Sequence, residues 1–179
     1  MTGDDAQWRS ALRSGTADGF DDLVAAYTPR LWRHLVGLGY AAADADDLVQ
    51  ETFLRAWQHR HRYDGNWAVS TWLFTIARNL GASLRRRRQP VRAIADHDPP
   101  VVEPAPHHPA VDGLWDRARR LLDDRTYQAL WLRYGDDLPH EDIAAILGIT
   151  AGHVRVLIHR ARGQLAMDIA RSEDSHATI

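Results

Sequence analysis

Residues 139–150 read PHEDIAAILGIT, and this stretch decides the fold of the C-terminal part of the chain. Ile143 and Leu147 have the spacing of one apolar face of a short helix. Gly148 suits a left-handed turn directly after that helix. Thr150 can cap a following helix, because its hydroxyl can accept a hydrogen bond from a backbone N–H two or three residues further on. The stretch therefore predicts a helix, a tight turn and the start of a second helix.

The predicted second helix combines an apolar face with a basic one. Helix, short turn with glycine, then basic helix is the helix-turn-helix pattern of DNA-binding proteins. The alternative is an ordinary helical hairpin with a solvated arginine face. The absence of acidic residues from Ile143 to Met167 favours the helix-turn-helix. The apolar positions are Val154, Leu157, Ile158, Ala161 and Leu165, and the basic positions include Arg155, His159, Arg160 and Arg162.

Proline divides the chain into two segments with helical periodicity. Six of the eight prolines lie between Pro90 and Pro109, and proline supports neither a helix interior nor a central strand. The prediction is two domains joined by an extended acidic linker and followed by a disordered tail. The domains are residues 1–89 and 113–171, the linker is residues 90–112 and the tail is residues 172–179.

The N-terminal segment is predicted to be a bundle of three or four helices. Apolar residues recur at three- and four-residue spacing over residues 20–38, 48–57 and 73–84, and no long stretch alternates with period two. Asp44 is the expected N-cap of the second of these helices, and Ser70 that of the third. The chain as a whole is predicted to be all-α, with two small helical domains. Four tryptophans on apolar stripes are expected in the core: Trp32, Trp57, Trp72 and Trp131.

The charges are balanced in sum but separated along the chain. The 179 residues carry a formal net charge of -2, and the 22 positions counted as Lys or Arg are all arginine. Near-neutrality argues against a protein that binds nucleic acid unaided through a uniformly basic surface. Yet residues 1–92 hold 13 arginines and 10 acidic residues, while residues 93–114 hold 4 acidic residues and no arginine. Four consecutive arginines, residues 85–88, end the third predicted helix and suit contacts with phosphates.

Acidic residues gather at the start of the second predicted helix. Four acidic side chains there exceed what a helix cap requires, so the cluster favours a basic protein partner. The chain contains no cysteine, which excludes disulfides and any zinc site that needs a thiolate. The cluster consists of Asp44, Asp46, Asp47 and Glu51.

Three blocks of the chain, in this order, resemble the extracytoplasmic-function (ECF) sigma factors of bacterial RNA polymerase. Residues 44–57, DADDLVQETFLRAW, look like the family's region 2 helix that docks on the polymerase. Residues 70–79, STWLFTIARN, look like its promoter-melting and -10-reading helix. Residues 138–165 look like its region 4 helix-turn-helix, with the family's HRAR at residues 159–162. The resemblance implies a function in promoter-specific transcription initiation.

The resemblance also implies roles for particular residues. The surface that binds the clamp helices of the polymerase β′ subunit corresponds to Asp44, Asp47, Gln50 and Glu51. Asn79 corresponds to a position that reads an unpaired base of the -10 element, with Trp67 as a stacking surface. The adjacent DNA backbone would be held by Arg78, Arg85, Arg86, Arg87 and Arg88. The -35 element would meet His153, Arg155, His159 and Arg160, with Arg162 as a phosphate contact or a helix-end charge.

The predicted recognition helix departs from the family's usual pattern at His153, Val156 and Leu157. Val156 and Leu157 either pack inward or contact thymine methyl groups. His153 either donates to a phosphate or is solvated at the start of the helix. These residues leave fewer hydrogen-bond donors for base edges than is usual in the family.

The leading hypothesis is a non-catalytic initiation factor, an ECF-type sigma factor. Its expected partners are core RNA polymerase, through the β′ clamp helices and the β subunit, and promoter DNA, with an anti-sigma protein as a further candidate. The alternative is a stand-alone helix-turn-helix regulator, in which the acidic helix and the linker lack a purpose. No cofactor or metal is expected, because the pairs His59/His61 and His107/His108 have no convincing third ligand. The absence of a signal peptide and of a ~20-residue apolar run predicts a cytoplasmic protein without membrane insertion.

Overall fold

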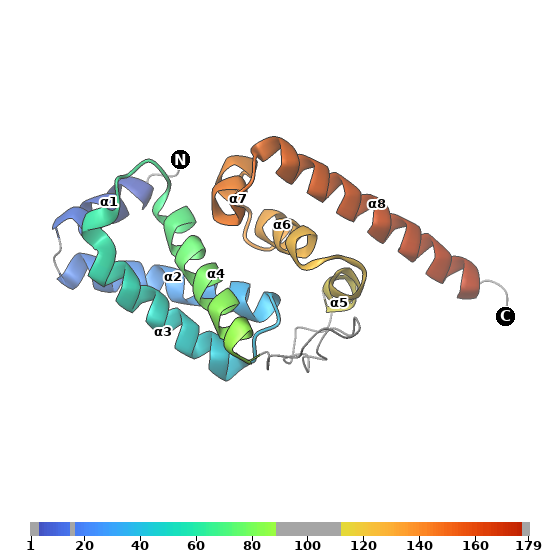
Figure 1. Ribbon diagram of the computed structural model, residues 1–179, viewed down its shortest axis with the longest axis horizontal. Coiled ribbons are helices and arrows are strands. Elements are labelled where there is room, and N and C mark those ends of the chain that lie inside the picture. Colours follow the sequence, from blue (N-terminus) through green and yellow to red (C-terminus); the bar gives the residue numbers. More distant parts are fainter. Residues whose placement is uncertain (1–3, 15–16, 89–111, 177–179) are drawn as a thin grey trace. The chain divides into compact units, whose positions relative to one another are not determined.

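The computed structural model describes residues 4–14, 17–88 and 112–176. The chain divides into two compact units, Met1–Ala105 and Pro106–Ile179. Every regular element in the described residues is a helix (Figure 1), which confirms the all-α prediction. The predicted linker lies outside the described residues except for Asp112, where the first helix of the second unit begins.

The described part of the first unit is a helical bundle. It consists of α1 (Asp4–Ser14), α2 (Ala17–Gly37), α3 (Ala42–His59), the short 3-10 helix η1 (Arg60–Arg62) and α4 (Val69–Arg88). Helices α2, α3 and α4 pack against one another, and α1 contacts α2, η1 and α4. Burial of the apolar faces stabilises the bundle, since most helical stability in proteins comes from tertiary packing of an amphipathic face. The core includes Leu23, Leu31, Leu35, Phe53, Leu73 and Phe74.

The two predicted N-caps of this unit are wrong, because both residues lie inside their helices. Helix α3 begins at Ala42, so Asp44 stands in its first turn. The Asp44 carboxylate accepts hydrogen bonds from Arg88 of α4 instead of from local backbone N–H groups. Helix α4 begins at Val69, which is fully buried, and Ser70 follows it within the helix.

The four tryptophans expected in the core are only partly buried. Trp32 is 37% exposed, and its prediction is wrong because Leu31 and Leu35 occupy the inward face of α2. The other three are half-buried at the edges of the two cores, as is common for so large a side chain. Each lies against another aromatic ring: Trp57 against Phe20 (4.8 Å between centroids), Trp72 against Tyr63 (5.2 Å) and Trp131 against Trp115 (4.5 Å).

The described part of the second unit contains the predicted helix-turn-helix. Its helices are α5 (Asp112–Leu121), α6 (Asp124–Tyr134), α7 (His140–Leu147) and α8 (Ala151–His176), and α8 contacts the other three. Between α7 and α8, Gly148 adopts a φ of 66°, the left-handed conformation expected there. The backbone N–H of His153 donates to Thr150 Oγ1 over 3.2 Å, which confirms the predicted cap. Ile143 and Leu147 are buried, as their spacing predicted.

Helix α8 continues past residue 171, where the second domain was predicted to end. The Ser172 hydroxyl donates to the Asp168 carbonyl oxygen over 2.9 Å. Arg117 of α5 contacts both residues, with Nη1 3.1 Å from Ser172 Oγ and Nε 3.3 Å from Asp168 Oδ2. These contacts between α5 and α8 are a physical reason for a helix that reaches His176. The structure thus describes helix over residues 172–176, where the sequence predicted a disordered tail, and residues 177–179 lie outside the described part of the chain.

Within residues 4–14, 17–88 and 112–176, no single helix is long and apolar enough to cross a membrane. Helix α7 and residues 151–172 of α8 meet that test only as a pair, across a bend of 100°. The same described residues hold no group of three or more His, Cys, Asp or Glu side chains placed to bind a metal ion.

The N-cap of α6 gives the second unit a measurable dependence on pH. Asp123 Oδ1 accepts hydrogen bonds from the backbone N–H groups of Arg125 and Thr126, both at 3.0 Å, and Oδ2 accepts one from Thr126 Oγ1 at 2.7 Å. Burial acts to raise the pKa of Asp123, but these hydrogen bonds together outweigh it and hold the pKa below its ordinary value. The cap therefore contributes stability above about pH 4 that is lost as pH falls through the lowered pKa.

We expect Asp123→Ala to lower the free energy of unfolding by ~1 kcal/mol at pH 7. Asp123→Asn retains an acceptor oxygen and should lose less. As pH falls below about 4 and through the lowered pKa, the difference between the wild type and the alanine variant should shrink, because the wild-type carboxylate becomes protonated and loses its charged hydrogen bonds. Urea unfolding of the full chain at pH 7 and at low pH measures both effects. A difference that is the same at both pH values would contradict this account of the cap.

Candidate functional site

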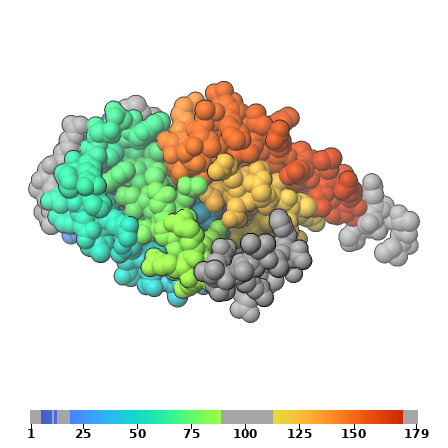
Figure 2. All heavy atoms as spheres, viewed as in Figure 1, coloured from blue at the N-terminus to red at the C-terminus, as the bar shows by residue number. Residues whose placement is uncertain are grey.

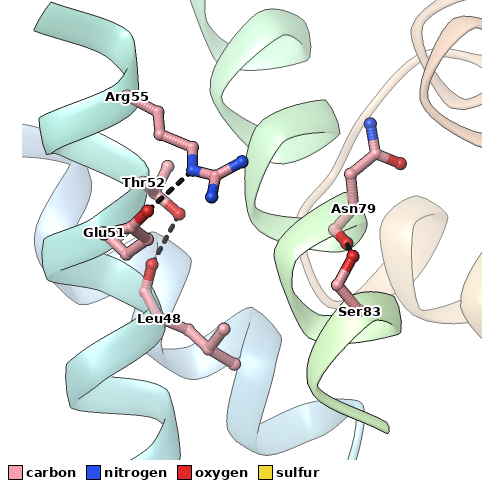
Figure 3. Close-up of polar contacts among 6 residues, drawn as sticks. All are labelled: Leu48, Glu51, Thr52, Arg55, Asn79 and Ser83. Atoms are coloured by element: carbon pink, nitrogen blue, oxygen red, sulfur yellow. Dashed lines mark hydrogen bonds and ion pairs between the residues drawn. The ribbon is translucent and has the colours of Figure 1, made fainter. Parts of the chain in front are cut away.

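Three of the four predicted docking residues share the outer face of α3: Asp47, Gln50 and Glu51. Asp47 and Gln50 are exposed and Glu51 is half-buried, while Ala45, Leu48 and Thr52 are buried on the opposite face. The Glu51 Oε1 atom accepts a hydrogen bond from Arg55 Nε at 2.7 Å, and Thr52 Oγ1 donates to the Leu48 carbonyl oxygen at 2.6 Å (Figure 3). The helix thus presents carboxylate and amide groups outward.

Leu54 belongs to the same outer face and was not predicted from the sequence. Its side chain is 51% exposed, and it lies seven residues after Asp47 and three after Glu51, so the three are on one side of the helix. An exposed leucine beside acidic groups suits a protein surface better than a nucleic acid one. Its position in the helical register, compared with the buried stripe of α3, was the signal that could have found it.

Asp44 lies where α3 meets the end of α4. Its side chain is 17% exposed, and Arg88 donates to both of its carboxylate oxygens, with Nη2 2.8 Å from Oδ1. The hydrogen bond from Arg88 to Asp44, followed by the attraction of the two charges, raises the pKa of the Arg88 guanidinium. The two helices adjoin on the surface of the first unit (Figure 2). Asp44 and Arg88, predicted for different partners, therefore bind each other.

Arg85 also makes contacts inside the first unit. Its Nη2 atom donates to the Leu38 carbonyl oxygen at 2.5 Å, and its guanidinium lies over the Tyr40 ring, 4.6 Å from the centroid. The Tyr40 side chain packs closely against α4 at Gly81, because a Cβ added at that glycine would lie 2.5 Å from the tyrosine hydroxyl oxygen. A glycine is needed at this position of the helix.

The remaining arginines at the end of α4 face solvent. Arg86 and Arg87 are exposed and make only local contacts in the described structure, with the hydroxyl and the carbonyl oxygen of Ser83 at 2.9 and 3.4 Å. Arg78, one turn before Gly81, is half-buried. Of the predicted phosphate-binding arginines, Arg85 and Arg88 therefore hold the fold, whereas Arg86 and Arg87 are exposed at the end of α4.

Asn79 and Trp67, the two predicted base contacts, are both exposed. The amide of Asn79 points away from α4, while its backbone carbonyl oxygen accepts a hydrogen bond from Ser83 Oγ at 2.9 Å (Figure 3). Trp67 lies in the loop that leads into α4, and its side chain is 47% exposed. Both side chains can reach a ligand without unfolding any helix.

On α8, the predicted -35 residues are all on the surface. His153, Arg155, His159, Arg160 and Arg162 are exposed. Val156 is 44% exposed whereas Leu157 is buried in the core. Of the two apolar departures from the family pattern, Leu157 packs inward and Val156 stands on the outer face among the basic residues. Arg155 Nη2 lies 3.8 Å from Glu141 Oε1 of α7.

Comparison with known proteins identifies both units. The family model for sigma-70 region 2 matches residues 23–91, and the model for sigma-70 region 4 matches residues 115–165. These two regions define an RNA polymerase sigma factor of the sigma-70 class. The chain is 31% identical over 172 residues to RNA polymerase sigma factor CarQ of Myxococcus xanthus, a match that covers 89% of this chain and 98% of CarQ. It is 34% identical over 151 residues to the ECF RNA polymerase sigma factor EcfG of Rhodopseudomonas palustris, covering 82% of each. The chain therefore belongs to the ECF sigma factors.

Solved structures have the same fold. The structure of CnrH in complex with the cytosolic domain of CnrY matches 93% of this chain and 97% of that chain, with a TM-score of 0.71 and 25% identity. The sigma factor RpoE in complex with the anti-sigma factor NepR from Bartonella quintana matches 82% of this chain and 93% of that chain, with a TM-score of 0.64 and 25% identity. As an ECF sigma factor, the protein binds core RNA polymerase and directs initiation at specific promoters, so the stand-alone regulator is not favoured.

Proposed function

We propose that the outer face of α3 docks on the clamp helices of the polymerase β′ subunit. The observation that carries this proposal is the exposure of Asp47 and Gln50 with Glu51 and Leu54 on one face of a helix whose other face is buried. Carboxylates steer a basic partner and fix its register, while a central apolar side chain adds buried area. Asp44 supports this face from the side, because its carboxylate is already engaged by Arg88.

The promoter is read, on this proposal, by two separate helices. Asn79 hydrogen-bonds an unpaired base of the -10 element, Trp67 stacks on a base, and Arg78, Arg86 and Arg87 hold the adjacent backbone. Arg85 and Arg88 act indirectly, by fixing the end of α4. On α8, Arg155 and His159 with Arg160 meet the -35 element in the major groove, and His153 and Arg162 contact phosphates. The exposed Val156 can touch a thymine methyl group there.

The two domains, residues 1–89 and 113–171, work inside the polymerase assembly. The acidic linker, residues 90–112, threads the positively charged RNA-exit region beside the β subunit, where its carboxylates imitate nucleic acid phosphates. The factor catalyses no reaction itself and acts in the cytoplasm with the polymerase. An anti-sigma protein is a further partner. This is supported by the two structural relatives described above, because RpoE was solved with the anti-sigma factor NepR and CnrH with the cytosolic domain of CnrY.

Run-off transcription with core RNA polymerase and a library of genomic fragments tests the proposal. We expect discrete transcripts that require both the factor and the core enzyme. A gel shift of promoter DNA at about 0.1–0.2 M salt separates the alternatives, because the factor alone should bind weakly and the holoenzyme tightly. Tight binding by the factor alone, without any factor-dependent transcript, would contradict the proposed function.

A further inference from the structure

The loop that carries Trp67 is held in place through the backbone of that residue. We define the Trp67 loop as residues 64–68, between η1 and α4. Trp67 as a residue is 47% exposed, yet its carbonyl oxygen accepts a hydrogen bond from the Tyr63 hydroxyl at 2.6 Å. A second donor, Arg9 Nη2 of α1, lies 3.3 Å from the same oxygen. The residue is thus fixed at its main chain and exposed at its side chain.

Tyr63 is a rigid donor. The residue is only 8% exposed, and its ring lies against Trp72 of α4 with 5.2 Å between centroids and an interplanar angle of 40°. The backbone N–H of Tyr63 donates to the Arg60 carbonyl oxygen at 3.1 Å, which ties it to the end of η1. The hydroxyl group that donates to the Trp67 carbonyl oxygen therefore belongs to a side chain fixed in the packed interior of the unit.

The rest of the loop has internal hydrogen bonds that limit its motion. Asp64 Oδ1 accepts from the backbone N–H of Asn66 at 2.9 Å, and Oδ2 accepts from its side-chain Nδ2 at 2.6 Å. Gly65 between them has a φ of 77°, a conformation that favours glycine. At the other end, the Trp72 N–H donates to the Ala68 carbonyl oxygen at 3.2 Å, so the loop passes directly into the first turn of α4. These hydrogen bonds order the loop in the absence of a ligand.

We propose that Tyr63, assisted by Arg9, is a positioning residue for promoter opening. It holds the Trp67 carbonyl so that the exposed indole is presented to an unpaired DNA base in a fixed orientation. This inference rests on the proposed role of the Trp67 loop in reading the melted -10 strand. A surface ordered in advance avoids the entropy cost of ordering it on binding, and that saving appears as affinity for the unpaired strand. Arg9 precedes the segment that matches sigma-70 region 2, so α1 lies outside that match but contributes to a site within it.

The test uses the full chain assembled with core polymerase. Tyr63→Phe keeps the ring and removes only the donor, so we expect affinity for a fork DNA with an unpaired -10 strand to fall roughly 2- to 12-fold, the range for loss of one neutral hydrogen bond. Affinity for core polymerase and for a duplex that carries only the -35 element should be unchanged. Arg9→Gln should act in the same direction by less, because its contact is longer.

The double variant separates positioning from general stability. Trp67→Ala should weaken fork binding by itself, and adding Tyr63→Phe to it should cause no further loss if Tyr63 acts through Trp67. An additive double variant, or a Tyr63→Phe protein with wild-type fork binding beside a defective Trp67→Ala protein, would overturn the positioning role alone. Wild-type fork binding by Trp67→Ala would overturn the proposed role of the loop, and the inference with it.

Discussion

Replacing Asp47 with arginine is expected to weaken binding of core RNA polymerase by ~30-fold or more, because reversal of a charge at the centre of an interface costs several kcal/mol. Asp47 is exposed in the first turns of α3, so the helix and the core beneath it should be unaffected. The same variant should lose factor-dependent transcription from every promoter equally, since docking precedes promoter recognition. Fluorescence anisotropy of the labelled factor titrated with core polymerase measures the affinity directly.

Asp22→Arg is the matched control for this experiment. Asp22 is also exposed and its replacement makes the same change in net charge, but it lies on α2 and not on the outer face of α3. We expect the control to lose no more than a few-fold, through the long-range field alone. Equal losses in the two variants would attribute the effect to overall charge, and tight binding by Asp47→Arg would remove α3 from the docking surface.

The helix-turn-helix could be predicted in detail because its determinants are local. Gly148 and Thr150 act through their own backbone conformation and a neighbouring N–H, so their roles follow from the order of residues alone. The periodicity of α2, α3 and α4 is equally local, and the apolar stripes read from the sequence form the observed core. The three blocks that resemble ECF sigma factors lie on the helices predicted to carry them.

Contacts between residues distant in the chain could not be predicted in this way. Arg88 meets Asp44 and Arg85 meets Leu38 only after α4 has packed beside the start of α3, and no periodic pattern encodes that pairing. The four arginines at residues 85–88 therefore could not be distinguished in the sequence, although Arg85 and Arg88 make contacts that stabilise the fold. The support of the Trp67 loop by Arg9 is of the same kind, since it joins residues 58 positions apart.

The orientation of side chains around a helix axis is the second reason why sequence predictions and structure differ. Val156 and Leu157 are adjacent and chemically alike, yet the register of α8 exposes one and buries the other. Trp32 was assigned to the core from its apolar neighbours, whereas the inward face of α2 is filled by Leu31 and Leu35. The candidate site is thus the part of each helix that the core does not use, and it becomes defined only once the packing is known.

Replacing Arg155 with alanine is expected to weaken binding of the holoenzyme to promoter DNA by roughly 5- to 150-fold, which corresponds to ~1–3 kcal/mol for loss of one arginine contact with a base. Arg155 is exposed on α8, and its only described ion pair is the 3.8 Å contact with Glu141. Loss of that exposed pair costs the fold little. The effect should therefore come from DNA and should be confined to promoters that retain the -35 element.

Competition binding with promoters altered one base pair at a time identifies the contact. If Arg155 reads a base, one -35 position loses its preference in the variant while the others keep theirs; a phosphate contact would instead weaken all sequences alike and reduce the salt dependence by about one counterion. Arg171→Ala is the control, because Arg171 is an exposed arginine on the same helix, roughly 24 Å further along the axis. Glu141→Gln should bind at least as tightly as the wild type, since it removes a carboxylate beside the DNA-facing arginine. Wild-type affinity in Arg155→Ala would exclude this face of α8 from -35 recognition.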